Sequence, residues 1–196
     1  MSQAIEHHEH HDAGSKVIFG FWVYIMTDCI LFATLFATYA VLRNNTYGAP
    51  GIQEITHLPL VLTETLLLLV STFIYGLGSA AMHKDRLGGV MLALIITFVL
   101  GLAFADLEYH QFSALVQMGA SWKASAFLSS FFGLVGLHWV HVIVGLVWML
   151  VLMMQLCLQK LSTTMKTRLI CLGMFWNFLN ILWIFIFTIV YLMGVI

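Results

Sequence analysis

Four carboxylic acids lie inside apolar runs of the sequence or at their edges: Asp28, Glu64, Asp106 and Glu108. A carboxylate near the centre of a bilayer costs about 2.5–3.5 kcal/mol on insertion scales, so it must face protein or water, pair with another group, or hold a proton. Its chemistry would be that of a proton relay, an ion site or a counter-ion. The alternative is that it only hydrogen-bonds a neighbouring helix or an assembly partner. Both interpretations stay open for Asp28 and Glu64, whereas we expect Asp106 and Glu108 to reach interfacial water and to serve packing.

Asp28 is the most exceptional of these acids. The run from Val17 to Leu42 contains no other charged residue and is long enough to cross a bilayer. At ~1.5 Å per helical residue, Asp28 lies roughly 16 Å from Val17 in a hydrocarbon slab about 30 Å thick. We therefore expect that this carboxylate does not face the lipid chains.

Uncharged polar residues repeat with helical spacing in the last two apolar runs. His138 and His141 are three residues apart and share one helix face, a spacing that could supply two metal ligands. A transmembrane haem is usually gripped from two helices, and no other histidine lies in the middle of an apolar run. We therefore expect the two histidines to donate hydrogen bonds to a carboxylate or carbonyl on an adjacent helix. Asn177 and Asn180 have the same spacing, and we expect them to pack helices together.

The first 16 residues are polar and hold the segment from His7 to His11, with four histidines in five positions. Such a tract could bind a transition metal. The favoured interpretation is a disordered tail, which gives two units: a tail over residues 1–16 and a single membrane domain over residues 17–196.

The composition requires a membrane protein. Of the 196 residues, 61% are hydrophobic and only 9% are charged, and the net charge of −1 argues against nucleic-acid binding. The three cysteines form no pair and are expected to be small buried apolar residues. Five runs reach the length needed for a transmembrane helix, so the predicted fold is an all-α bundle of five spans. They are Val17–Leu42, Leu58–Met82, Gly88–Leu107, Ala126–Leu156 and Leu169–Met193.

The basic residues predict the orientation of this bundle. Six of the eight lysines and arginines fall on the side of the N-terminus and two on the other side, which places the N-terminus in the cytoplasm and the C-terminus in the periplasm. The sequence shows no internal repeat, which disfavours an inverted-repeat transporter. It also lacks a nucleophile with its base, a phosphate-binding loop and a zinc-binding H-E-x-x-H motif, so no autonomous catalytic site or metal site is predicted.

The polar residues and their surroundings resemble one known family, subunit III of the haem-copper terminal oxidases. The resemblance covers essentially all of the spans, and its blocks agree in order and spacing. They are Phe19-Gly-Phe-Trp22 with Asp28, Leu58-Pro-Leu60 with Glu64, Leu107-Glu-Tyr109, the Gly-x-His-x-x-His-Val-x-x-Gly pattern of Gly136–Gly145, and Trp176–Trp183. The five-helix form, the histidine-rich leader and the end at Val190–Gly194 are most similar to the ubiquinol-oxidising branch.

The resemblance implies an accessory subunit of a complex in the bacterial inner membrane that oxidises ubiquinol, reduces oxygen to water and pumps protons. Haem and copper would belong to subunit I, and this chain would carry no cofactor beyond phospholipid held between helix groups. It would support assembly, stability and proton uptake, with Asp28 and Glu64 as the informative residues and Glu108, His138 and His141 as their network. One departure concerns the last span, where the family commonly has His and Asp in place of Asn177 and Asn180. Neither asparagine exchanges a proton near neutral pH.

Three other functions remain open at this point. The chain could be subunit III of a cytochrome c oxidase, because the electron donor cannot be derived from these residues. A small proton-coupled transporter would use Asp28 and Glu64 as carrier carboxylates and would work without partners. A membrane haem protein would show haem absorbance in the isolated chain.

Overall fold

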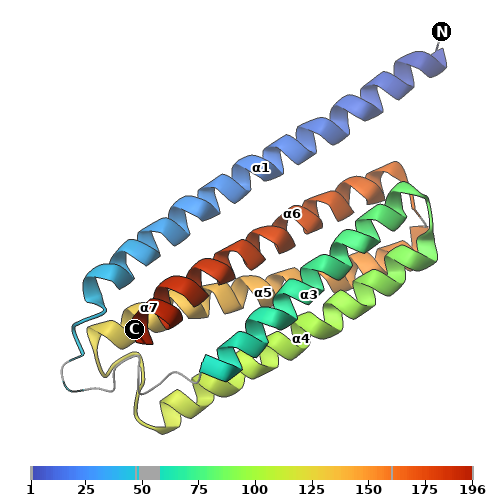
Figure 1. Ribbon diagram of the computed structural model, residues 1–196. Coiled ribbons are helices and arrows are strands. Elements are labelled where there is room, and N and C mark those ends of the chain that lie inside the picture. Colours follow the sequence, from blue (N-terminus) through green and yellow to red (C-terminus); the bar gives the residue numbers. More distant parts are fainter. Residues whose placement is uncertain (1, 47, 49–57, 160, 196) are drawn as a thin grey trace.

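The computed structural model describes residues 2–46, 48, 58–159 and 161–195, and all regular secondary structure in these residues is helical (Figure 1). Five of these helices are long and apolar enough to cross a membrane, which confirms the predicted all-α bundle of five spans. The chain ends lie at opposite ends of the bundle, as an odd number of spans requires. The orientation in the membrane stays a prediction. The helices are α1 (Ser2–Leu42), α3 (Leu58–His83), α4 (Leu87–Gln117), α5 (Ala126–Gln159) and α6 (Thr163–Ile186), followed by a π-helical turn, η1 (Phe187–Leu192), and the short α7 (Met193–Val195).

Two helices are much longer than their apolar runs. The backbone of α1 is helical from Ser2, well before the predicted start of the first span at Val17, and the division into a tail and a membrane domain stays a prediction. The tail contains no proline and can extend a helix that the adjoining span has already nucleated. Helix α4 continues ten residues past the predicted end at Leu107 and stops before Gly119, which has a φ of +80°. Polar residues end an apolar run without ending a helix, whereas a glycine in the left-handed region does.

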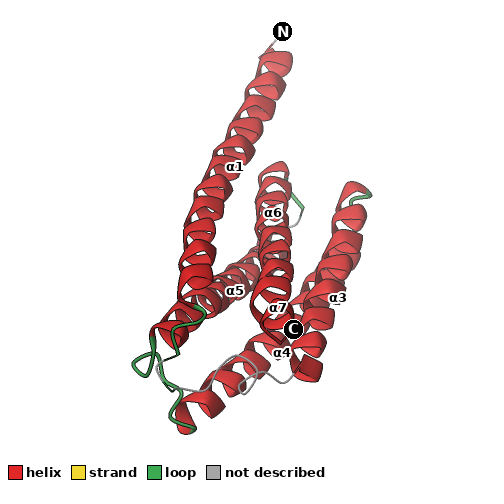
Figure 2. Ribbon diagram, turned by 60° about the vertical axis from the view of Figure 1, so that its left-hand side comes forward, coloured by secondary structure: helices red, strands yellow, loops and turns green. Residues whose placement is uncertain are grey.

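Helices α3 and α4 form the most closely packed antiparallel pair. Small residues allow the close approach: a Cβ added to Gly78 would lie 2.6 Å from Cβ of Ala93, and one added to Gly89 would lie 3.0 Å from Cβ of Ala81. Asp85 lies in the turn between these helices. Its carboxylate forms an ion pair with Lys166 of α6, with 2.6 Å between Oδ1 and Nζ. Helix α1 packs instead against α5 and α6 and stands apart from α3 and α4 (Figure 2).

Trp176 of α6 ties four helices together in the interior. Its side chain is 2% exposed, and its indole Nε1 donates a hydrogen bond of 3.1 Å to Oγ of Ser71 on α3. Gly101 of α4 and Gly145 of α5 make room for the ring, because a Cβ on either glycine would lie within 3.3 Å of ring carbons. Helix α6 is accordingly the central helix, because 67% of an 18-residue apolar stretch of its span is buried, against 22% for the corresponding stretches of α1 and α3.

The cysteines correct another expectation. Cys171 is buried in the bundle, but Cys29 is only half-buried and Cys157 is exposed. A thiol is apolar enough to face lipid, so an apolar run does not by itself place a cysteine inside the protein.

Candidate functional site

Asp28 faces His141 across the contact between α1 and α5. The side chain of Asp28 is 12% exposed, and its Oδ2 lies 4.0 Å from Nε2 of His141. The other ring nitrogen of His141, Nδ1, donates to the carbonyl of Leu137 one turn earlier at 2.8 Å. Nε2 of His141 faces the carboxyl group without a hydrogen bond, because Oδ2 of Asp28 is buried and has no hydrogen-bond partner among the described residues. The two side chains would attract each other as an ion pair when the imidazole is protonated, and the rings of Phe32 and Phe175 lie around the imidazole.

His138 lies on the same helix but has different partners. It is fully buried, and its Nε2 donates to the carbonyl of Leu179 on α6 at 3.1 Å, which confirms the expected hydrogen bond to a carbonyl on an adjacent helix. Its ring lies 5.2 Å from that of Trp183 between centroids. The two histidines thus connect α5 to two neighbours, α6 through His138 and α1 through His141.

Glu64 of α3 and Glu108 of α4 form a second acidic pair inside the bundle. Their side chains interact directly and are 0% and 1% exposed. Gln111, one turn after Glu108, donates from Nε2 to Oε1 of Glu64 at 2.7 Å. The Oε2 atom of each glutamate is buried and receives no hydrogen bond from another residue that the structure describes. Two ionised carboxylates in contact would repel each other strongly in such surroundings, so at least one of the two carboxyl groups holds a proton.

The position of Glu108 overturns the expectation that it reaches interfacial water. Asp106 does lie exposed on the surface of α4, 3.7 Å from His110. Two residues along an α-helix correspond to a rotation of about 200°, so Asp106 and Glu108 point to opposite sides of α4. The helix also continues for nine residues past Glu108, which keeps this carboxylate well inside the bundle.

We expect a Glu64→Gln variant to keep nearly the stability of the native chain, because an amide still accepts from Gln111 and donates to Glu108. In contrast, Glu64→Leu should lower the free energy of unfolding by about 1–3 kcal/mol, since it leaves buried polar groups without partners. Thermal unfolding in mild detergent measures both, with Asp106→Leu as an exposed control. A Glu64→Leu chain as stable as the native one would show that the pair does not hold α3 to α4.

The two asparagines of α6 lie in different surroundings. Asn180 is buried, but its Oδ1 accepts no hydrogen bond from the described residues. Asn177 is exposed and lines a groove between α1 and α6. Neither amide makes a hydrogen bond to a histidine of α5 among the described residues, and the role of Asn177 and Asn180 in packing the helices together stays a prediction.

Several polar groups in the interior of the bundle are not among the residues predicted from the sequence. Gln111 could have been found, because it is three residues from Glu108 on one helix face. Tyr191, which is 2% exposed and has a buried hydroxyl with no partner among the described residues, lies on the π-helical turn η1. Trp183 donates from Nε1 to Oγ1 of Thr65 at 3.0 Å and links α6 to the helix of Glu64. The periodicity of the sequence does not predict these contacts, because they join helices that are far apart in the sequence.

The sequence-predicted residues therefore form two separate pairs rather than one network: Asp28 with His141, and Glu64 with Glu108. His138 contacts neither pair through a hydrogen bond. No group of three or more histidine, cysteine, aspartate or glutamate side chains comes together in the described residues. The side chains of His7 to His11 lie outside the described part of the structure, so metal binding there stays a prediction.

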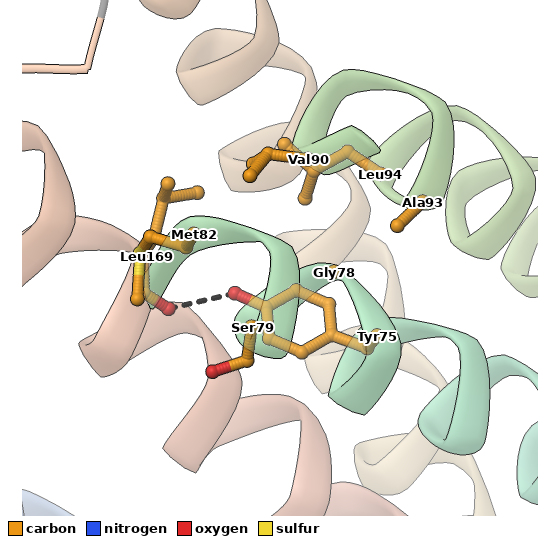
Figure 3. Close-up of a pocket in the computed structure, with 8 residues that line it drawn as sticks. All are labelled: Tyr75, Gly78, Ser79, Met82, Val90, Ala93, Leu94 and Leu169. Atoms are coloured by element: carbon orange, nitrogen blue, oxygen red, sulfur yellow. Dashed lines mark hydrogen bonds between the residues drawn. The ribbon is translucent and has the colours of Figure 1, made fainter. Parts of the chain in front are cut away.

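A small cavity lies near the other end of α3, where this helix meets α4 and α6. It encloses about 20 Å³, room for roughly one water molecule. Figure 3 shows the Tyr75 hydroxyl directed at the main chain of α6, where it donates to the carbonyl of Leu169 at 2.7 Å. The lining is mostly apolar, so this cavity offers little to a ligand beyond that tyrosine.

Removing the Tyr75 hydroxyl should weaken the contact between α3 and α6. We expect Tyr75→Phe to lower the free energy of unfolding by about 1 kcal/mol, the usual net value of one hydrogen bond. Tyr109→Phe is the matched control, because Tyr109 is 57% exposed. Equal thermal unfolding midpoints for the two variants would contradict a stabilising role for the Tyr75 hydroxyl.

Comparison with known proteins places this arrangement in a family. The sequence matches the family described as cytochrome c oxidase subunit III over residues 2–195. Cytochrome bo(3) ubiquinol oxidase subunit 3 of Pseudomonas aeruginosa is 52% identical over 188 residues, which are 95% of this chain and 90% of the relative. Quinol oxidase subunit 3 of Bacillus subtilis is 39% identical over 93% of this chain and 90% of its own. Cytochrome c oxidase subunit 3 of Alkalihalophilus pseudofirmus is 40% identical over 93% and 89%, respectively. With its five membrane-spanning helices, this multi-pass membrane chain belongs to the cytochrome c oxidase subunit III family.

Proposed function

We propose that this chain is the accessory subunit III of a proton-pumping terminal quinol oxidase, a complex that couples ubiquinol oxidation to the reduction of oxygen to water. The observation that carries the proposal is the 52% identity, over 95% of the chain, to a cytochrome bo(3) ubiquinol oxidase subunit 3. A relative named as a cytochrome c oxidase subunit 3 is 40% identical, so family membership alone leaves the electron donor open. The higher identity favours ubiquinol.

In this function the chain acts through a neighbouring subunit. Haem and copper belong to subunit I, which this chain contacts in the bacterial inner membrane with its N-terminus in the cytoplasm. The imidazoles at the centre of the bundle support this division of labour, because each already serves a protein contact. His138 bonds the main chain of α6, and His141 bonds its own helix and faces Asp28.

The carboxyl pairs suit a role in proton uptake and in packing. Asp28 and His141 would attract each other as an ion pair when the imidazole is protonated, near the surface where α1 meets α5. Glu64 with Glu108 is enclosed between α3 and α4 and suits a structural role, because both residues are almost completely buried. We therefore assign the role in proton uptake to Asp28, with His141 as its partner.

Purification from native membranes in mild detergent tests the proposal. The chain should co-elute with a larger haem-bearing subunit, and the purified complex should oxidise ubiquinol faster than reduced cytochrome c. Faster oxidation of reduced cytochrome c would assign the complex to the cytochrome c oxidases. A colourless homo-oligomer that transports protons without partners would contradict an accessory role.

A further inference from the structure

A long groove runs between α1 and α6 on the surface of the bundle. It is open to the surroundings, has a volume of about 730 Å³ and is bounded by α1 from Trp22 to Phe36 and by the facing side of α6 and η1. At ~1.5 Å per residue, the α1 wall is about 21 Å long, well over half of a hydrocarbon slab about 30 Å thick. One lipid chain reaches only to the middle of that slab. A single occupant that fills the groove must therefore pass through the membrane midplane.

The wall formed by α6 carries a hydrogen-bonding group in the middle of this groove. Asn177 is 14 residues from the start of its span at Thr163 and 15 residues from its end at Leu192, which places it at mid-depth. Its side chain is exposed and lines the groove. A hydrocarbon chain would leave this amide unpaired, which is costly where water is absent. The occupant that fits must offer a hydrogen-bonding partner at the level of Asn177.

The wall formed by α1 allows a backbone to come close. Cys29 and Ala33 both line the groove and are four residues apart, which is the spacing of small residues that lets two transmembrane helices approach. The bulkier Trp22 and Phe36 stand at the two ends of this wall. A partner helix would therefore lie between Trp22 and Phe36, with its backbone close to Cys29 and Ala33.

We propose that the groove between α1 and α6 receives one transmembrane helix of another subunit, which places a hydrogen-bonding side chain opposite Asn177. The inference rests on the proposed membership in a multi-subunit oxidase and adds the surface and the chemistry of the partner. Its length excludes a single acyl chain as the filling group, and its amide requires a polar partner. The apolar walls around Asn177 require that the rest of the helix face be apolar.

Site-directed photo-crosslinking in the purified complex tests this assignment. A benzophenone amino acid would replace Ile181, which lines the groove and is 54% exposed. The matched control replaces Val99, which is 57% exposed in the middle of α4 and lies outside the groove. After illumination, mass spectrometry should identify an apolar membrane-spanning peptide of another subunit attached at position 181 with a yield several-fold above that at position 99. Lipid adducts only at position 181, or equal protein adducts at both positions, would overturn the proposal.

Substitution of the amide provides a second measurement. Asn177→Leu should lower the detergent concentration at which the complex dissociates, whereas Asn177→Ser, which keeps a hydrogen-bonding group, should stay close to the native value. A complex with leucine that resists detergent as well as the native one would overturn the polar contact. Both experiments start from a complex that co-purifies with a haem-bearing subunit. Failure of the groove assignment in that complex would leave the proposed function intact, whereas absence of co-purification would contradict the function itself.

Discussion

A Gly101→Leu substitution is expected to prevent most of the chain from reaching a folded, monodisperse state. A Cβ at this position would lie 2.8 Å from Cδ2 of Leu146 and 2.9 Å from Cη2 of Trp176, closer than real Cβ contacts. The remaining atoms of leucine would extend into the same space. Overpacking of this kind typically costs about 1–3 kcal/mol and occasionally more. Here it would also displace the Trp176 indole from its hydrogen bond to Ser71, so the effect should lie at the upper end of that range.

Graded variants show whether the close contact is the cause. Gly101→Ala should destabilise less than Gly101→Leu, because alanine adds only the Cβ atom. Gly76→Leu is the control, since a Cβ on Gly76 meets nothing within 4 Å and the residue is exposed on α3. The yield of monodisperse protein after a heat challenge in mild detergent measures all three. A Gly101→Leu chain that survives as well as Gly76→Leu would contradict the packing described around Trp176.

The second large effect is expected from Asp28→Ala in the assembled oxidase. The substitution removes the carboxyl group that faces His141 and with it the only acid of the first span. Because alanine needs no polar partner, assembly should be almost unchanged. The rate of proton uptake or the lifetime of the enzyme during turnover should fall several-fold instead. Oxygen consumption and proton release followed together in vesicles measure both properties.

Two variants sharpen this prediction. Asp28→Asn keeps the shape of the side chain but cannot exchange a proton near neutral pH, so it should behave like Asp28→Ala. Asp106→Asn removes an exposed acid of α4 and should have little effect. Unchanged proton pumping and unchanged inactivation kinetics in assembled Asp28→Ala would defeat the role assigned to Asp28.

The apolar runs predicted the five spans because bilayer thickness sets the length of a spanning helix. They did not predict where the backbone stops being helical. Helix α4 runs on through polar residues to Gln117, and the last span changes to a π-helical turn at Phe187. At that turn, the Thr188 hydroxyl donates to the carbonyl of Ile184 at 2.8 Å, a local contact that hydropathy does not report.

The acidic residues could be singled out from sequence because a carboxylate inside an apolar run is costly. Which residues of other helices they contact could not be predicted, because a helix that is apolar on all sides gives no periodic signal for the face turned toward protein. Asp106 and Glu108 illustrate the difficulty: they are two residues apart, yet one is exposed and the other is 1% exposed. The pairing of Asp28 with His141 likewise depends on the mutual rotation of α1 and α5, which only the assembled bundle determines.

The central claim is that this chain serves a haem-copper subunit without carrying a redox centre of its own. The direct measurement compares ubiquinol oxidation, haem absorbance and proton release of the purified complex before and after selective removal of this chain. We expect the haem spectrum and the initial oxidation rate to persist, while proton uptake or turnover lifetime declines. Loss of haem absorbance together with this chain, or identical proton release and lifetime without it, would contradict the claim.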